Sequence, residues 1–190
     1  MKKILCILLL LLTGCSSKTS MIEIQKHVYV EKEFKDSWLE TNEFGDSYIK
    51  EELQGGYHYH FDQQFLEIFF NTGGKIELYN YSIKKNDLII SGEMIPPKTI
   101  RLVHPHLDNV TREGGIIHEL GHYFDEKHQF SSSKQFTELY KKYRTLFNQK
   151  TKKEYFAECF KEYVGGHQEK VKPFHSYMKT ITQKIRQKNK

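Results

Sequence analysis

Two histidines and a glutamate near the middle of the chain have the types and spacing of a metal site. His118-Glu119-Leu120-Gly121-His122 is an HExxH pattern. On a helix, residues four apart are separated by about 400°, so both imidazoles point the same way and can bind one tetrahedral Zn²⁺. Glu119 lies about 100° around the helix from His118, where its carboxylate can take a proton from a metal-bound water and return it.

A second acidic pattern, Glu154-Tyr155-Phe156-Ala157-Glu158, lies downstream. Glu154 and Glu158 are four residues apart and share one helical face, so one carboxylate can bind the metal while the other orients a histidine. Alone, this pattern would also fit a solvated acidic stripe, and HExxH alone would fit an amphipathic helix with two metal-free histidines. Because the two patterns occur together, we predict Glu154 as the third ligand.

The HExxH segment has the features of a buried scaffold helix. Its apolar residues recur at helical spacing and define one face: Ile116, Ile117, Leu120 and Phe124. Asp125 follows His122 by three residues, and we expect it to accept the second ring N–H of that histidine and fix its tautomer.

The two patterns together, HELGHYFD followed by EYFAECF, resemble the anthrax lethal factor family and the Pro-Pro endopeptidases. These are gluzincin-type zinc endopeptidases, and the resemblance spans residues 95–165. It implies one zinc ion per chain on three ligands: His118, His122 and Glu154. It also implies that Glu119 is the general base, that Asp125 and Glu158 are supporting acids, and that the substrate is a peptide or protein.

One position departs from this family. Its members have a tyrosine, thought to stabilise the transition state, seven residues before the zinc glutamate, and this chain has Phe147 there. Tyr143 and Tyr140 are candidates to replace it. Loss of one oxyanion donor costs about 10²–10³ in rate. A catalytically weak or inactive zinc-binding surface lipoprotein that acts as a binding protein is therefore the alternative to an active enzyme.

Other histidines occur in closely spaced pairs, His58 with His60 and His104 with His106. Such pairs are usually surface residues, but a zinc-handling protein could use them as ligands. Arg101 and His104 lie on the strand expected before the HExxH helix, and gluzincins pair extended substrate with an edge strand there.

The N-terminus has the pattern of a bacterial lipoprotein signal. Two lysines precede nine apolar residues over 4–12, a run too short to span a bilayer. The following Leu-Thr-Gly-Cys resembles a lipobox. It implies that the signal over 1–14 is removed, that Cys15 is lipidated, and that 15–21 tethers the domain to the outer face of a membrane. A signal peptide without lipidation is the competing interpretation. If the signal is removed and Cys15 carries lipid, Cys159 is the one other cysteine, so we expect no disulfide in the mature chain.

Composition restricts the class of protein. Hydrophobic residues make up 38% of the 190 residues and aromatic residues 14%, which excludes a wholly disordered chain. A mean hydropathy of -0.65 excludes a multispanning membrane protein. Residues 16–130 contain 19 acidic and 12 basic residues, whereas 131–190 contain 5 acidic and 15 basic residues. For an exported chain without nucleic-acid-binding motifs, this basic half does not indicate a nucleic-acid partner.

Apolar periodicity predicts an α+β fold. We expect strands over 22–30, 75–81, 87–92 and 99–104, with one helix over 61–70 among them. Four helices follow over 112–129, 134–148, 152–165 and 173–187. Residues 33–56 have no clear pattern. The prediction is one zincin-like domain over 22–190: a small mixed sheet with one helix, then a helical half that carries HExxH, in a monomeric chain.

Overall fold

The computed structural model describes residues 20–41, 45–85, 88–104, 113–149 and 151–189. The predicted signal peptide over 1–14 and the predicted lipidation site at Cys15 lie outside these residues. Within them, every helix is too short or too polar to span a bilayer.

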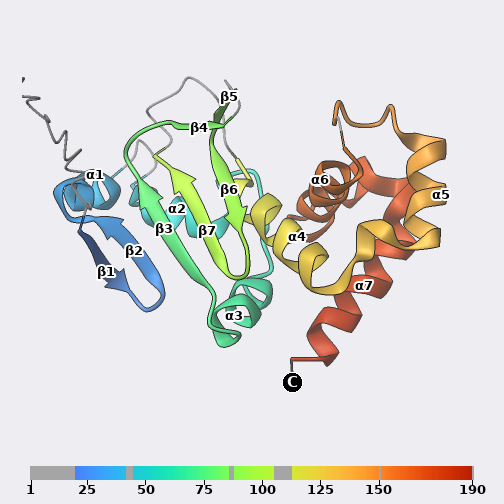
Figure 1. Ribbon diagram of the computed structural model, residues 1–190, viewed down its shortest axis with the longest axis horizontal. Helices are drawn as coiled ribbons and strands as arrows, with labels where there is room; N and C mark the ends of the chain where they lie inside the picture. The colour runs from blue at the N-terminus through green and yellow to red at the C-terminus, as the bar shows by residue number, and fades with distance from the viewer. Residues whose placement is uncertain (1–19, 42–44, 86–87, 105–112, 150, 190) are drawn as a thin grey trace, which may run out of the picture.

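Five strands form a mixed sheet (Figure 1). Their bounds are β1 Met21–Gln25, β2 Val28–Glu31, β3 Lys75–Tyr79, β6 Gly92–Ile95 and β7 Thr99–Val103. The spatial order is β1-β2-β3-β7-β6. The three central strands run parallel, and β1 and β6 pair antiparallel at the two edges. A separate antiparallel pair joins β4 (Ile83–Lys85) to β5 (Leu88–Ile90).

The strand expectations need two corrections. The single strand expected over 22–30 is a hairpin of β1 and β2, because the chain reverses at His27, whose φ is 68°. The edge strand beside the HExxH helix is β6, which follows the expected strand over 87–92. Because β7 lies between β3 and β6, Arg101 and His104 are not at the edge of the sheet.

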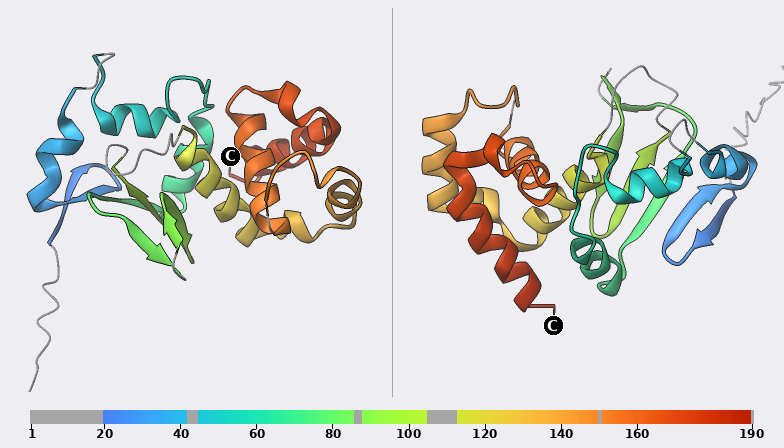
Figure 2. Two further views of the ribbon diagram at one scale, coloured as in Figure 1. Left: turned by 90° about the horizontal axis from the view of Figure 1, so that it is seen from above. Right: turned by 180° about the vertical axis from the view of Figure 1, so that it is seen from behind.

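The N-terminal half contains three α-helices where the sequence predicted one. They are α1 Lys35–Leu39, α2 Tyr48–Gln54 and α3 Gln64–Asn71, with a 3₁₀ turn η1 at Lys32–Phe34. The helix α2 begins where the Ser47 side chain accepts a hydrogen bond from the Lys50 N–H, and it ends at Gly55 with φ of 88°. Figure 2 shows α2 and α3 on one face of the sheet.

The helical half contains the four predicted helices, but the one predicted over 134–148 ends at Tyr143. They are α4 Gly115–His128, α5 Lys134–Tyr143, α6 Lys152–Val164 and α7 His175–Gln187. Two 3₁₀ segments connect them, η3 Phe130–Ser132 and η4 Gln168–Phe174. Together with the mixed sheet they confirm the predicted α+β class.

One hydrophobic core joins the sheet to the helical half. On the sheet, the register aligns four fully or almost fully buried aliphatic residues on one face: Ile76, Leu78, Ile100 and Leu102. Phe65 of α3 then contacts Phe124 of α4 and Phe160 of α6, with ring centroids 5.9 and 5.4 Å away. Because these contacts cross from one half to the other, the chain forms a single domain.

The helices α4 and α6 pack closely against each other in this core. A Cβ atom added at Gly121 would lie 2.9 Å from the Ala157 Cα and 3.3 Å from its Cβ. Only a residue without a side chain lets the two backbones come this close. As a result, the HExxH helix and the helix that carries Glu154 face each other directly.

This contact predicts the effect of a side chain at position 121. We expect Gly121→Val to reduce the free energy of unfolding by about 1–3 kcal/mol, because the added methyl groups must displace the α6 backbone. Urea denaturation measures the change. Lys179→Val places the same β-branched residue at an exposed helical position, and we expect it to change stability by no more than about 0.5 kcal/mol. Equal effects of the two substitutions would contradict the close contact.

Candidate metal centre

Three predicted ligands converge on one point between α4 and α6. The Nε2 atoms of His118 and His122 each lie 3.2 Å from Oε2 of Glu154. One ligand atom from each of the three residues lies within 4.8 Å of the other two. In the described part of the chain, this is the one group of histidine, cysteine and acidic side chains with such geometry. The structure thus brings together residues 36 positions apart in the sequence, in an arrangement that could hold a metal ion.

The N-terminus of α6 positions Glu154. The Thr151 side chain caps the helix by accepting a hydrogen bond from the Glu154 N–H at 3.2 Å. Glu154 therefore lies in the first turn, with its side chain directed at the two histidines. Its side chain is 45% exposed, against 17% for His118 and 18% for His122. Of the three side chains, that of Glu154 is therefore the most accessible to solvent.

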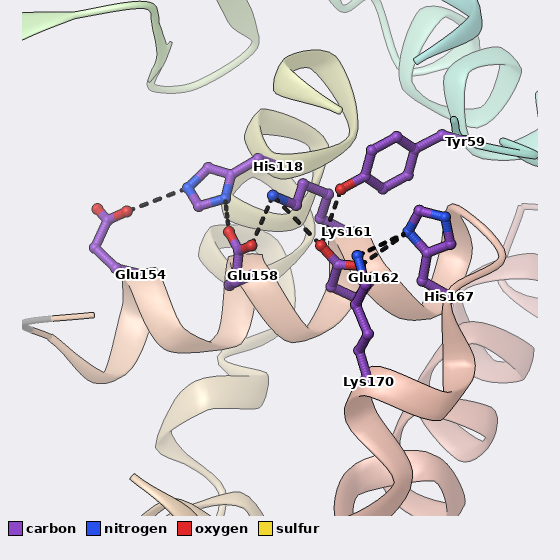
Figure 3. A network of polar contacts seen from close by, with 8 residues as sticks. All are labelled: Tyr59, His118, Glu154, Glu158, Lys161, Glu162, His167 and Lys170. Atoms are coloured by element: carbon purple, nitrogen blue, oxygen red, sulfur yellow. Dashed lines mark hydrogen bonds and ion pairs between the residues drawn. The ribbon is translucent and has the colours of Figure 1, made fainter. Parts of the chain in front are cut away.

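Glu158 holds the other nitrogen of His118. Its Oε2 lies 3.2 Å from the His118 Nδ1, while Nε2 of the same ring faces Glu154 (Figure 3). A proton on Nδ1 that is donated to Glu158 leaves the Nε2 lone pair directed at the site between the ligands. The structure thus places Glu158 as the sequence predicted, one turn after Glu154 on the same face of α6.

Asp125 has a different partner from the one expected. Its Oδ1 accepts a hydrogen bond from the Ser131 N–H at 2.6 Å, and its Oδ2 accepts one from the Ser131 hydroxyl at 2.7 Å. The chain turns back after α4 through Gln129, whose φ is 56°, and this turn brings Ser131 to the carboxylate. Among the described contacts, Asp125 therefore supports the end of α4 and does not bond the His122 ring.

Glu119 lies beside the edge strand. Its side chain is almost fully buried, at 7% exposure, and it accepts a hydrogen bond from the Met94 N–H of β6. Burial raises the pKa of its carboxyl group. Glu119 is outside the group of three ligands, as expected for a residue that would exchange a proton rather than bind metal.

The carboxylates and His118 stabilise each other's charged forms. Burial would lower the pKa of His118, but hydrogen bonds to Glu154 and Glu158 outweigh it and raise that pKa to about 9. Hydrogen bonds from His118 and His122 hold the pKa of Glu154 well below its usual range. Burial opposes ionisation of Glu158, yet His118 and a lysine beside it lower its pKa. The site is therefore a compact group of matched charges.

The candidate oxyanion residues lie elsewhere in the core. The rings of Phe147 and Tyr140 pack against Tyr155, with centroids 5.3 and 5.1 Å away. Tyr143 packs against Phe174 of η4, and its backbone carbonyl accepts a hydrogen bond from the Tyr155 hydroxyl at 2.5 Å. None of these three contacts a ligand in the described part of the chain.

The three paired histidines that the structure describes, His58, His60 and His104, do not join the candidate ligands. His58 bonds Glu113 through Nδ1 at 2.6 Å, and His60 is exposed. His104 is buried, with its Nε2 3.1 Å from the Ser37 carbonyl oxygen. His106 lies outside the described residues. These contacts give His104 a structural role and do not support the zinc-handling alternative.

Arg101 also has a partner away from the ligands. Its Nε donates to Oε2 of Glu77 on β3 at 3.1 Å, and its Nη1 lies 3.5 Å from Glu93 on β6. Arg101 thus links three neighbouring strands.

Two features of the site were not predicted from the sequence, the position of β6 and the group of charged side chains beside Glu158. Lys161 and Glu162 were visible in the sequence as part of α6. Their contact with Tyr59 joins residues about a hundred positions apart, and no local pattern indicates it.

The Asp125 contacts predict a stability effect without a metal effect. We expect Asp125→Ala to lower the free energy of unfolding by about 1–3 kcal/mol, because the buried Ser131 N–H loses its acceptor. Metal affinity should stay near that of the unmodified chain. Asp125→Asn keeps one acceptor oxygen and should destabilise less. Thermal unfolding and a metal titration measure the two properties. A loss of metal affinity at unchanged stability would show that Asp125 acts on His122 instead.

Comparisons with known proteins show a similarity in fold and none in sequence family. No family model matches the chain, and no curated protein sequence matches it. Among solved structures, the chain is similar to the Pro-Pro endopeptidase PPEP-2 from Paenibacillus alvei. The TM-score is 0.50 at 15% identity, over 63% of this chain and 84% of the other. The described domain therefore has an α+β fold like that of this endopeptidase.

Proposed function

We propose that the protein is a zinc-dependent metalloendopeptidase that hydrolyses peptide bonds in a peptide or protein substrate. The observation that carries this proposal is the convergence of His118, His122 and Glu154 beside the buried carboxylate of Glu119. Similarity to a Pro-Pro endopeptidase in fold supports a peptide substrate.

The three ligands fit zinc. Two imidazole nitrogens and one carboxylate oxygen are a donor set that zinc accepts in hydrolytic sites, with the fourth position open. In a tetrahedron with metal–ligand distances near 2.0–2.1 Å, neighbouring ligand atoms lie about 3.3 Å apart. The 3.2 Å distances from both Nε2 atoms to Glu154 Oε2 agree with this spacing. A bound zinc ion would polarise the scissile carbonyl and lower the pKa of water.

Other parts of the chain would transfer the proton and bind the substrate. Glu119 takes a proton from the attacking water and delivers it to the leaving amine, and burial, which raises the pKa of its carboxyl group, favours this exchange. Among the described strands, β6 lies at the edge of the sheet, where an extended peptide would pair. Because Met94 of β6 already bonds Glu119, a peptide on this edge would lie directly beside the general base.

We further propose that lipid on Cys15 anchors the domain to the outer face of a bacterial membrane. The support is the pattern of the first residues, in which an apolar run over 4–12 precedes Leu12-Thr13-Gly14-Cys15. The described domain begins a few residues later, at Ser20, which would keep the site close to the membrane surface.

One observation favours a second candidate function. Phe147 has no hydroxyl group, and among the described contacts the Tyr143 ring packs against Phe174 rather than against a ligand. A zinc-binding lipoprotein with weak or no peptidase activity would keep the scaffold and lack this donor. Cleavage of an unbiased peptide library that a chelator abolishes would identify the enzyme. One tightly bound zinc without any cleavage would identify the binding protein.

The role of Glu119 gives the third prediction. We expect Glu119→Gln to retain zinc, because Glu119 is not a ligand, and to lose peptide cleavage by at least about 10²-fold, because the amide cannot exchange the proton. Zinc content and library cleavage measure the two properties. Glu126→Gln, on an exposed position of the same helix, is the matched control and should cleave normally. Undiminished cleavage by pure Glu119→Gln protein would contradict the mechanism.

A further inference from the structure

Lys161 contacts Glu158, the residue that bonds the Nδ1 atom of His118. It follows Glu158 by three residues on α6, and its Nζ lies 2.6 Å from Oε1 of Glu158. The side chains of both residues are largely buried, at 15% and 14% exposure. Figure 3 shows the lysine side chain between Glu158 and Glu162, on the side of His118 away from Glu154.

The packing of Lys161 fixes its position. A Cβ atom at Gly114 would lie 2.8 Å from the Lys161 Cδ and 3.0 Å from its Cγ, so the lysine stem fills a notch that only glycine leaves open. Gly114 has a φ of 79° and precedes the first residue of α4. The Lys161 Nζ also lies 5.9 Å from the centroid of the Tyr59 ring. The ammonium group is therefore confined between the two ligand helices.

Glu162 holds the ammonium from the other side. Its Oε1 lies 3.6 Å from the Lys161 Nζ and accepts a hydrogen bond from the Tyr59 hydroxyl at 2.9 Å. Its Oε2 lies 3.0 Å from Nδ1 of His167 and 3.1 Å from the Lys170 Nζ. Because several partners fix Glu162, whose side chain is 5% exposed, it gives Lys161 a rigid counter-charge.

The two carboxylate oxygens of Glu158 bond different partners. Oε1 bonds Lys161 and Oε2 bonds the Nδ1 atom of His118. Since a carboxylate is planar, a fixed Oε1 also fixes the direction in which Oε2 accepts. Without the ammonium, the Glu158 side chain could rotate, and the His118 ring would lose its partner and its orientation.

We propose that Lys161 is a positioning residue of the metal site, which acts through Glu158 to aim Nε2 of His118 at the zinc ion. This inference rests on the proposed function, because it assumes that the three ligands bind zinc. It differs from a surface ion pair such as that of Lys153 with Glu126, which also joins α6 to α4 but whose side chains are 59% and 47% exposed. Such an exposed pair contributes little to either helix.

Zinc affinity tests the proposal without peptide cleavage. The full chain is titrated with zinc in competition with a chromophoric chelator. We expect Lys161→Met, which keeps the length of the side chain and removes its charge, to bind zinc about 10–100-fold more weakly. Lys161→Arg should recover most of the affinity. Lys153→Met is the matched control on the same helix and should bind zinc like the unmodified chain.

A double variant tests whether Lys161 acts on His118 through Glu158. If Lys161 acts through Glu158, then Glu158→Gln combined with Lys161→Met should bind zinc no more weakly than Glu158→Gln alone. Circular dichroism of the metal-free proteins checks that each variant is folded. If Lys161→Met does not fold, Lys161→Gln, which keeps a hydrogen-bond donor without the charge, takes its place in both titrations.

The outcomes separate this inference from the proposed function. Zinc binding by the unmodified chain together with equal affinity in folded Lys161→Met would overturn the role of Lys161 alone. Additive losses in the double variant would overturn the route through Glu158. An unmodified chain that binds no zinc would overturn both the proposed function and the inference.

Discussion

The geometry of the candidate site depends on one contact, the approach of α4 to α6 where Gly121 meets Ala157. Because the backbones nearly touch there, a carboxylate in the first turn of α6 reaches two imidazoles on α4. A larger residue at this point would separate the helices and move Glu154 away from His118 and His122. The rest of the core, including the contact of Phe65 with both helices, keeps this approach in place.

A second constraint is electrostatic. The acidic part of the sequence ends near α4, and the basic part begins shortly after it, so the site lies where the two parts meet. Behind the ligands, charges of opposite sign alternate through Glu158, Lys161 and Glu162, each in contact with the next. Buried charges are tolerated only when they are paired in this way. The polar contacts continue from the ligands to Tyr59, in a loop before α3.

Local patterns predicted the two helices that carry the candidate ligands and predicted the N-terminal half poorly. The HExxH pattern and the spacing of Glu154 and Glu158 report helical faces directly, so ligands on two helices could be proposed without a structure. The hairpin of β1 and β2 was missed because its turn contains no glycine, and His27 instead adopts the positive φ that residues other than glycine adopt uncommonly. The helix α2 carried signals that could have identified it, a serine at its start and Gly55 at its end.

Contacts between residues distant in the sequence could not be predicted from helical spacing. The expected bond from His122 to Asp125 followed from helical spacing alone, whereas the turn after α4 supplies Ser131 as the partner. Likewise, nothing local indicates that Lys161 fills a notch at Gly114. In both cases the contact depends on how segments outside the helix pack against it. The sequence pattern describes each helix separately and therefore leaves such choices open.

The most direct test of the metal centre is anomalous diffraction at the zinc absorption edge from crystals of the zinc-loaded protein. The account predicts one strong anomalous peak per chain, about 2.0–2.2 Å from the Nε2 atoms of His118 and His122 and from a Glu154 oxygen. A peak bound to other side chains, such as His58 or His60, or no peak between α4 and α6, would contradict it.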